Sequence, residues 1–257
     1  MGKIFYFKRF SMNNEWAAMK VNTDGVLLGA AATLPEGEDI SVLDAGTGGG
    51  TIALMLAQRL SDSGRDRFMI RGIDIDQPSA DEAAENFATS PWAQHLTAQL
   101  MDLRECTDTY DLIVSNPPFY DATLPAPDSR RNTARHAAGS DSTALCGAPL
   151  SFVTLLDFAS THLKDPESQL SMILPADQEK LLLRMASSYG MTPSRLLRIK
   201  TTPRKPAKRI IAEFRLAGSL PTKRNPIFED LVIQTGPEIY TPEYEALVSP
   251  FYLSRQR

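Results

Sequence analysis

The stretch Val42-Leu43-Asp44-Ala45-Gly46-Thr47-Gly48-Gly49-Gly50-Thr51 decides the fold of this chain. It leads from an apolar run with the length of a buried strand into an apolar helical pattern between Ile52 and Leu60. A strand, a glycine turn and a helix in this order are typical of nucleotide sites. The dinucleotide fingerprint G-x-G-x-x-G would need Gly or Ala where this chain has Thr51, and the third small residue is Gly50 instead.

Apolar runs and helical patterns alternate along most of the chain, which predicts an α/β fold with a doubly wound, mostly parallel sheet. Two later runs, 195–201 and 209–216, alternate charged and apolar residues and are expected to close the sheet as an antiparallel hairpin. The expected elements are strand 41–45, helix 50–60, strand 68–74, helix 78–88, strand 96–102, strand 110–115, helix 150–163, strand 168–174 and helix 177–188.

The domain prediction is a single unit over 1–257, with an N-terminal segment 1–35 at the substrate and cofactor edge and a core with its C-terminal extension over 36–257. The stretch 120–149 has little periodicity and is expected to be a long loop.

Polar residues end four of the predicted strands, namely Asp44, Asp74, Asp102 and Asn116. The carboxyl ends of parallel strands meet at one edge of a sheet, so these side chains are expected to gather there. Asp74 is placed where a carboxylate accepts both ribose hydroxyls of a nucleoside. The alternative for each acid is a solvated carboxylate at a strand end.

The loop Asn116-Pro117-Pro118-Phe119 follows the apolar run 112–114 and carries the clearest chemistry. Proline fixes φ and has no N–H group, so the loop is stiff and its carbonyls are free to accept hydrogen bonds. The Asn116 oxygen and the Pro117 carbonyl are suited to accept both protons of a planar amino group, which aims its lone pair at an electrophile. Phe119 offers a stacking face worth about 1–3 kcal/mol per base. The alternative is a proline-rich turn that ends a strand.

Composition indicates an ordinary soluble globular protein, with 42% hydrophobic residues and a net charge of -4 over 257 residues. No signal peptide is visible, and the longest apolar stretch, 25–35, is short of a membrane span, so a cytoplasmic location is predicted. The two cysteines and three histidines match no metal-ligand spacing, so no metal is predicted.

Positive charge is concentrated between Arg195 and Arg224, where ten Lys and Arg residues accompany Glu213 as the single acid. A basic segment in an acidic chain predicts a polyanionic partner. A solvated hairpin face is the alternative. The candidate nucleic-acid contacts are Arg204, Lys205, Lys208 and Arg209, with Arg130 and Arg131 in the loop after Phe119.

Two motifs resemble those of S-adenosylmethionine-dependent methyltransferases of class I, which have a Rossmann-like sheet. The acid and glycines at 44–50 resemble their first motif, and Asn116 to Phe119 resembles the loop of enzymes that methylate amino nitrogens. The resemblance implies S-adenosylmethionine as cofactor and a contact from Asp102 to its adenine amino group. The residues that would bind the cofactor through the first motif and the second strand are Asp44, Gly46, Gly48 and Asp74.

Both ends of the chain resemble the bacterial tRNA(Val) adenine-N6 methyltransferases, through 5–10, 19–30, 231–233, 240–244 and 250–253. That family implies methylation of N6 of adenine-37 in the anticodon loop of a valine tRNA. Asn116, Pro117 and Phe119 would hold the target adenine, and Thr23 and Asp24 would line the methionine end of the cofactor. Phe119 stands where a Tyr is common in the family. A monomer is expected.

Three other functions stay open at this point. A glutamine-N5 methyltransferase of a release factor uses a similar Asn-Pro-Pro loop, but that substrate gives less reason for the basic segment. A guanine-N2 methyltransferase of ribosomal RNA fits both the loop and the charge, and only the terminal resemblance speaks against it. A non-catalytic RNA-binding module is disfavoured because the acids at 44 and 74 and Asn116 are all present.

Overall fold

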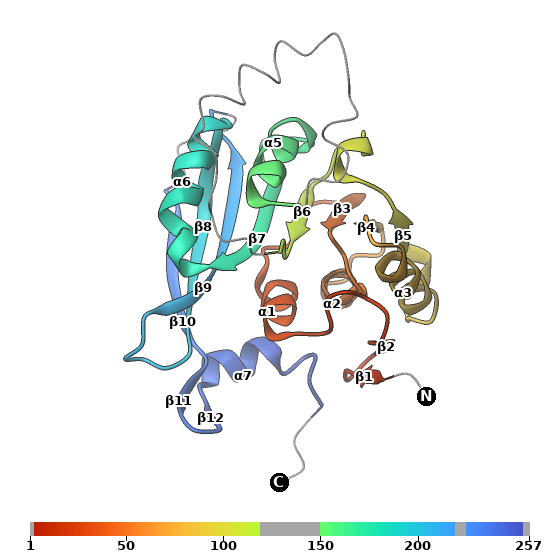
Figure 1. Ribbon diagram of the computed structural model, residues 1–257, viewed down its shortest axis with the longest axis horizontal. Coiled ribbons are helices and arrows are strands. Elements are labelled where there is room, and N and C mark those ends of the chain that lie inside the picture. Colours follow the sequence, from red (N-terminus) through yellow and green to blue (C-terminus); the bar gives the residue numbers. More distant parts are fainter. Residues whose placement is uncertain (1–2, 119–149, 219–224, 254–257) are drawn as a thin grey trace.

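A computed structural model describes residues 3–118, 150–218 and 225–253 of the chain. One eight-stranded sheet runs through it in the order β10-β8-β9-β7-β6-β3-β4-β5 (Figure 1). Its strands are β3 (Ile40–Ala45), β4 (Phe68–Asp74), β5 (Leu96–Leu100), β6 (Leu112–Ser115), β7 (Gln169–Pro175), β8 (Met191–Lys200), β9 (Ala207–Leu216) and β10 (Ile227–Val232).

The sheet is mostly parallel, as the sequence predicts. Strands β5, β4, β3, β6 and β7 pair in parallel, and β9 pairs antiparallel with both β7 and β8. The predicted hairpin is therefore present, but it does not close the sheet, because β10 pairs in parallel with the outer side of β8. Four of the six side chains of β10 are exposed, so this edge strand lacks the alternation by which strands are found in a sequence.

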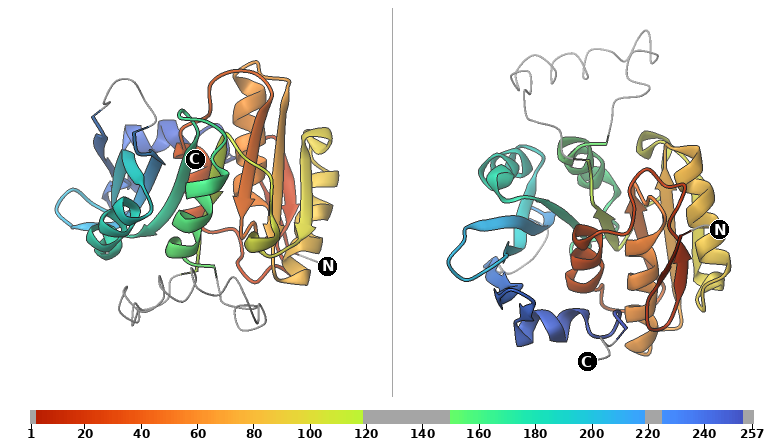
Figure 2. Two further views of the ribbon diagram at one scale, coloured as in Figure 1. Left: turned by 90° about the horizontal axis from the view of Figure 1, so that it is seen from above. Right: turned by 60° about the horizontal axis from the view of Figure 1, so that its bottom comes forward.

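Helices cover both faces of the sheet (Figure 2). Successive strand residues point to opposite faces. The helices are α1 (Thr23–Ala31), α2 (Thr51–Asp62), α3 (Gln77–Ala88), α5 (Phe152–His162), α6 (Glu179–Ser188) and α7 (Pro242–Val248). Because of the alternation, Val42 and Val114 face α1, α2 and α3, whereas Leu43 and Ile113 face α5 and α6.

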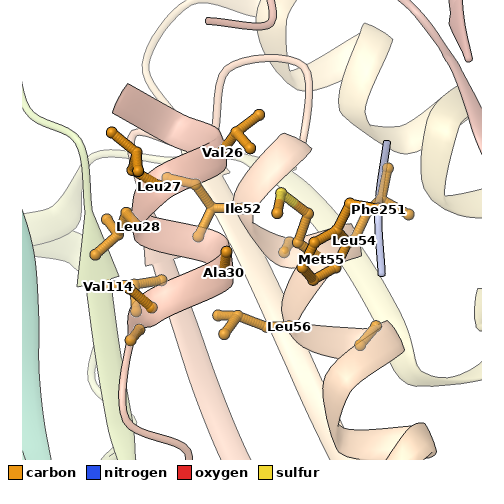
Figure 3. Close-up of a cluster of buried hydrophobic side chains, with 14 of the residues drawn as sticks. Val26, Leu27, Leu28, Ala30, Ile52, Leu54, Met55, Leu56, Val114 and Phe251 are labelled. Atoms are coloured by element: carbon orange, nitrogen blue, oxygen red, sulfur yellow. The ribbon is translucent and has the colours of Figure 1, made fainter. Parts of the chain in front are cut away.

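Helices α1 and α2 pack closely beside the centre of the sheet. Figure 3 shows Val26, Leu27 and Leu28 of α1 in one cluster with Ile52 and Met55 of α2. A Cβ on Gly29 would lie 2.9 Å from the Met55 side chain, so the two backbones approach as closely as they do only with glycine there. Helix α1 begins where the Asn22 side chain accepts the Gly25 N–H group at 2.9 Å.

Residues near the two ends of the chain pack against each other on one side of the core. A small hairpin forms from β1 (Ile4–Tyr6) and β2 (Ser11–Asn13), and a second one from β11 (Gln234–Gly236) and β12 (Ile239–Tyr240). The Lys8 backbone N–H donates to the Phe251 carbonyl at 2.7 Å, and the Phe7 ring stacks on Tyr252. The terminal stretches that resemble one family are therefore neighbours in space.

Every helix in the described ranges is too short or too polar to cross a lipid bilayer. The same ranges hold no group of three or more His, Cys, Asp or Glu side chains placed to bind a metal ion.

Candidate active site

The glycine turn between β3 and α2 has a backbone that other residues rarely adopt. Gly48 has φ of 55° and Gly50 has φ of 89°. A Cβ on Gly50 would lie 2.4 Å from the Phe87 ring, so any side chain there would displace α3. The turn is tied to the neighbouring strand, because Gly46 N and Thr47 N donate to the Ile73 carbonyl at 2.9 and 3.0 Å. Gly46 and Gly48 both line the cavity described next.

A cavity of about 310 Å³ opens beside this turn, at the carboxyl ends of the strands. Its volume is in the range of small-molecule sites. Its walls come from the N-terminal segment, the glycine turn, the ends of β4 and β5, the Asn116 loop and the start of α5. The lining residues are Ala18, Met19, Lys20, Asn22, Gly25, Gly46, Thr47, Gly48, Gly49, Thr51, Ile52, Ile73, Asp74, Ile75, Ser79, Met101, Asp102, Leu103, Arg104, Asn116, Pro118, Leu150 and Thr154.

Asp74 and Asp102 line this cavity from the ends of neighbouring strands, as predicted. The Asp74 oxygens accept hydrogen bonds from Gly48 N at 2.9 Å and from Asp76 N at 3.0 Å, and burial raises the pKa of Asp74 above its usual value. The hydrogen bonds from the Arg104 side chain hold the pKa of Asp102 below its usual value. A carboxylate oxygen can accept more than one hydrogen bond, so both acids keep acceptor capacity toward a ligand.

Asp44 lies behind the turn rather than in the cavity wall. It is fully buried, and its Oδ2 accepts from Thr47 Oγ1 at 2.8 Å and from Ala53 N at 3.2 Å. Its Oδ1 has no hydrogen-bond partner among the described residues. In this position Asp44 ties the glycine turn to the N-terminal end of α2. Asp44 therefore acts on a ligand only indirectly, through the shape of the glycine turn.

Burial raises the pKa of Asp44 from 3.8 to about 7, against the hydrogen bonds from Thr47 and Ala53, which lower it. Between about pH 4 and pH 7 the folded state then binds more protons than the unfolded state, so stability falls as pH rises through this window. We expect Asp44→Asn to remove this fall. Urea unfolding of both proteins from pH 4 to 8 measures it, with Asp81→Asn, an exposed carboxylate on α3, as control. Parallel curves for the native protein and Asp44→Asn would mean that Asp44 ionises as an ordinary carboxyl group.

Asn116 lies at the cavity with an unused acceptor. Its side chain is 8% exposed, its Oδ1 is buried without a hydrogen-bond partner among the described residues, and its Nδ2 donates to Met19 Sδ at 3.4 Å. Pro117 is buried and Pro118 is exposed at the cavity wall. Phe119 lies outside the described residues. A buried amide oxygen without a partner carries an energetic cost that a ligand with an N–H group removes.

Thr23 and Asp24, which the family resemblance places at the methionine end of the cofactor, do not line the cavity. Asn22 and Gly25 line the cavity, whereas Thr23 and Asp24 are not among the lining residues. Positions three apart share one face of a helix, so the residues between them at the start of α1 point elsewhere. Asp24 instead accepts a hydrogen bond from Arg209 Nε at 2.7 Å.

The sequence predicts that the N-terminal segment 1–35 lies at the cofactor edge, but it does not single out residues 18–20, which form one wall of the cavity. Ala18, Met19 and Lys20 line the cavity, and their backbone is held by buried polar side chains of α3. The sequence shows Ser79, Glu82 and Asn86 at helical spacing within the predicted helix 78–88, but that they are buried is visible only in the structure.

Half of the basic segment 195–224 is neutralised by acids from elsewhere in the fold. Arg195, Arg198, Lys200, Arg209 and Arg215 form ion pairs with Glu229, Glu179, Asp230, Asp24 and Glu167, respectively. Among the described residues, Arg204, Lys205 and Lys208 are exposed and have no acidic partner. These three residues, called the basic tip below, lie in or beside the β8–β9 connection. Arg130 and Arg131 fall outside the described residues.

The basic tip lies at the same edge of the sheet as the cavity. Because β9 is antiparallel to both β7 and β8, the carboxyl end of β8 points the same way as those of β7 and β6. The connection after Lys200 therefore emerges at the edge where Asn116 follows β6.

Comparisons with known proteins agree with this arrangement. The family model described as "Methyltransferase small domain" matches residues 18–137. A tRNA1(Val) (adenine(37)-N6)-methyltransferase of Porphyromonas gingivalis is 38% identical, with 99% of this chain and 96% of that protein aligned. A protein of the same name from Phocaeicola vulgatus is 36% identical, with 97% of both chains aligned.

Solved structures show the same fold at low sequence identity. A predicted O-methyltransferase from Agrobacterium tumefaciens has a TM-score of 0.61 and 16% identity, covering 91% of this chain and all of its own (100%). The structure of Pyrococcus horikoshii TYW2 in complex with MeSAdo has a TM-score of 0.55 and 14% identity, covering 85% of this chain and 72% of its own. The sheet is thus that of the class I methyltransferases, which take S-adenosylmethionine as methyl donor. Because the identity of 36–38% extends over nearly the full length of both chains, this chain belongs to the family of tRNA1(Val) (adenine(37)-N6)-methyltransferases.

Proposed function

We propose that this chain transfers a methyl group from S-adenosylmethionine to N6 of adenine-37 in the anticodon loop of a valine tRNA. The observation that carries the proposal is the Asn116 oxygen, which is buried at the cavity without a hydrogen-bond partner among the described residues. An exocyclic amino group supplies the N–H that this oxygen lacks. The names of the relatives supply the nucleotide and the tRNA.

The residues at the cavity fit S-adenosylmethionine. Asp74 offers carboxylate oxygens to the ribose hydroxyls, and Asp102 offers an acceptor to the adenine amino group. Ile75, Met101 and Leu103 provide apolar surface around the adenine ring. Gly46 and Gly48 allow the ligand to approach the backbone. Asp44 supports cofactor binding indirectly by holding the glycine turn, and Thr23 and Asp24 support it through the position of the start of α1.

The reaction needs alignment of the target nitrogen more than a strong base. S-adenosylmethionine supplies a methyl group that is already activated by its sulfonium. The Asn116 oxygen and the Pro117 carbonyl accept hydrogen bonds from the two amino N–H groups. These hydrogen bonds draw the nitrogen lone pair out of conjugation with the ring and toward the methyl group. Phe119 would stack on the flipped adenine. The nitrogen becomes acidic once alkylated, so the proton leaves to water and no His or Lys is assigned as base.

The basic tip is the proposed contact to the tRNA backbone. Its three positive side chains are exposed at the edge that carries Asn116, and an anticodon loop presents unpaired bases beside charged phosphates. Flipping a base out of a single-stranded loop costs less than from a duplex. Arg209, which is paired with Asp24, is assigned a smaller part in this contact.

Neutralising the basic tip is expected to weaken tRNA binding and its salt dependence. We expect the variant Arg204→Ala, Lys205→Ala, Lys208→Ala to flatten the log-log slope of affinity against salt by about 0.7–0.9 for each tRNA phosphate that the variant no longer neutralises. Fluorescence anisotropy with intact valine tRNA from low to near-physiological salt gives both slopes. S-adenosylmethionine affinity should stay unchanged.

The matched control is Arg65→Ala with Arg67→Ala, which removes positive charge before β4, at the opposite edge of the sheet. If the basic-tip variant keeps the native slope and affinity, the tip is a solvated turn and the tRNA binds elsewhere on the protein.

A product analysis tests the proposed reaction as a whole. The protein is incubated with labelled S-adenosylmethionine and, separately, total tRNA, ribosomal RNA or release factor. N6-methyladenosine at position 37 of valine tRNA is the expected product. Methylguanosine in ribosomal RNA, methylglutamine in the release factor, or no product would each replace the proposal with one of the alternatives.

We also propose that the chain acts as one folding unit in the cytoplasm. Residues near both ends of the chain pack on one core, and tRNA is modified in the cytoplasm.

A further inference from the structure

Helix α3 buries a stripe of polar side chains where a helix normally buries apolar ones. Ser79, Glu82 and Asn86 are each 1% exposed and follow the i, i+3, i+7 spacing of one helix face. A carboxylate removed from water is costly unless hydrogen bonds replace the lost hydration. The partners of this stripe therefore explain why it is polar.

Most of those partners are backbone groups of the N-terminal segment. Glu82 accepts hydrogen bonds from Glu15 N at 2.7 Å, from Trp16 N, and from Ala17 N at 3.3 Å. Ser79 Oγ accepts from Ala18 N at 3.1 Å. The Asn86 amide accepts from Asn13 N at 2.6 Å and donates to the Asn13 carbonyl at 3.1 Å.

The stripe also reaches the glycine turn on the other side of the segment. Asn86 Nδ2 donates to the Gly49 carbonyl at 2.8 Å, and Glu82 Oε1 lies 3.0 Å from the Cβ position that Gly49 leaves empty. The same side chains thus fix the distance between the N-terminal segment and the turn, which are two walls of one cavity.

The segment held by α3 continues into residues 18–20, which contact the loop at Asn116. Ala18, Met19 and Lys20 follow the three residues bound by Glu82 and line the cavity. Met19 Sδ accepts the Asn116 Nδ2 hydrogen at 3.4 Å. With Nδ2 engaged by Met19, the Asn116 amide turns its oxygen away from Met19 and keeps it available to an amino group.

We propose that Glu82 is a positioning residue of the methyltransferase site. It holds residues 15–17 by their backbone N–H groups, so that residues 18–20 close one wall of the S-adenosylmethionine cavity and Met19 orients the Asn116 amide. The inference rests on the cofactor assignment of the cavity and not on the identity of the RNA substrate.

Two substitutions at Glu82 and one control test this role. Glu82→Ala leaves three backbone N–H groups without their acceptor, whereas Glu82→Gln keeps one acceptor oxygen. Glu85→Ala is the matched control, since Glu85 is exposed on the same helix and its carboxylate accepts from the Asn13 side chain. Hydrogen exchange of the 13–20 segment is measured against β3 and β6, and S-adenosylmethionine affinity is measured by calorimetry.

We expect faster exchange over 13–20 in Glu82→Ala with unchanged protection of β3 and β6. The affinity for S-adenosylmethionine should fall about tenfold or more, since three hydrogen bonds of ordinary strength order the wall. Glu82→Gln should lie between Glu82→Ala and the native protein, and Glu85→Ala should match the native protein.

Unchanged exchange and affinity in Glu82→Ala would overturn the proposal, and so would an equal loss of protection in the segment and in the sheet, which marks a purely structural role. If Glu82→Ala does not fold, Ser79→Ala removes the acceptor for Ala18 N together with the hydrogen bond from Ser79 Oγ to Asp76, and it should show the same local pattern to a smaller degree. Neither measurement uses RNA, so a different methyl acceptor would leave the result standing.

Discussion

Asn116→Ala is expected to slow methyl transfer by about 10²–10³-fold, the cost of removing one preorganised partner of the reacting group. The affinity for S-adenosylmethionine should stay close to that of the native protein, because the deleted interaction acts on the aligned amino group in the transition state. The side chain is already buried at the cavity with its oxygen unpaired among the described residues, so its removal disturbs few other contacts. Single-turnover kinetics with saturating tRNA measure the rate of the chemical step.

Asn116→Asp provides a comparison, since it keeps the acceptor oxygens but gives up the N–H group that bonds to Met19. Calorimetry with S-adenosylmethionine confirms that each variant retains an intact cavity. A rate for Asn116→Ala within a few-fold of the native rate would remove Asn116 from the mechanism.

Asp74→Ala is expected to weaken S-adenosylmethionine binding by about 2–3 kcal/mol, through the loss of two hydrogen bonds to a charged acceptor. This corresponds to a loss of about 30- to 150-fold in affinity. Asp74 also accepts the Gly48 N–H group, so part of the loss comes from a looser glycine turn. Titration calorimetry gives the affinity directly.

The control for this loss is Asp81→Ala, which removes an exposed carboxylate from α3, outside the cavity lining. Asp74→Asn separates charge from geometry, because it keeps one acceptor oxygen. A folded Asp74→Ala protein with native affinity would place the ribose at another residue.

The strand ends could be predicted because each rests on local sequence. A buried apolar run followed by a polar residue fixes both the strand and the edge at which it ends, which is why Asp74, Asp102 and Asn116 line one cavity. Asp44 obeys the same pattern but lies behind the turn, since it is still within β3 and the turn that follows, with the start of α2, covers it. Strand position alone does not separate these two outcomes.

The charge of the 195–224 segment could not be translated into a surface from the sequence. Its ion-pair partners Asp24, Glu179 and Glu229 belong to α1, α6 and β10, and only the packing of these elements against β8 and β9 brings the charges together. The same limit applies to the segment 15–20, which carries the cavity wall and whose hydrogen bonds to α3 span more than sixty positions. Contacts of this kind depend on the completed fold.

The contact between the two ends of the chain bears on how the protein is made. The Lys8 side chain donates to the Ser249 carbonyl across 241 positions, and Gln58 of α2 donates to the Pro250 carbonyl at 3.1 Å. During synthesis the hairpin at residues 4–13 leaves the ribosome well before its packing partner at Phe251, because residues 14–250 are translated between them. The N-terminal hairpin thus completes its packing only after residues 249–251 have been made, whereas the cavity wall at 18–20 can form as soon as α3 is available.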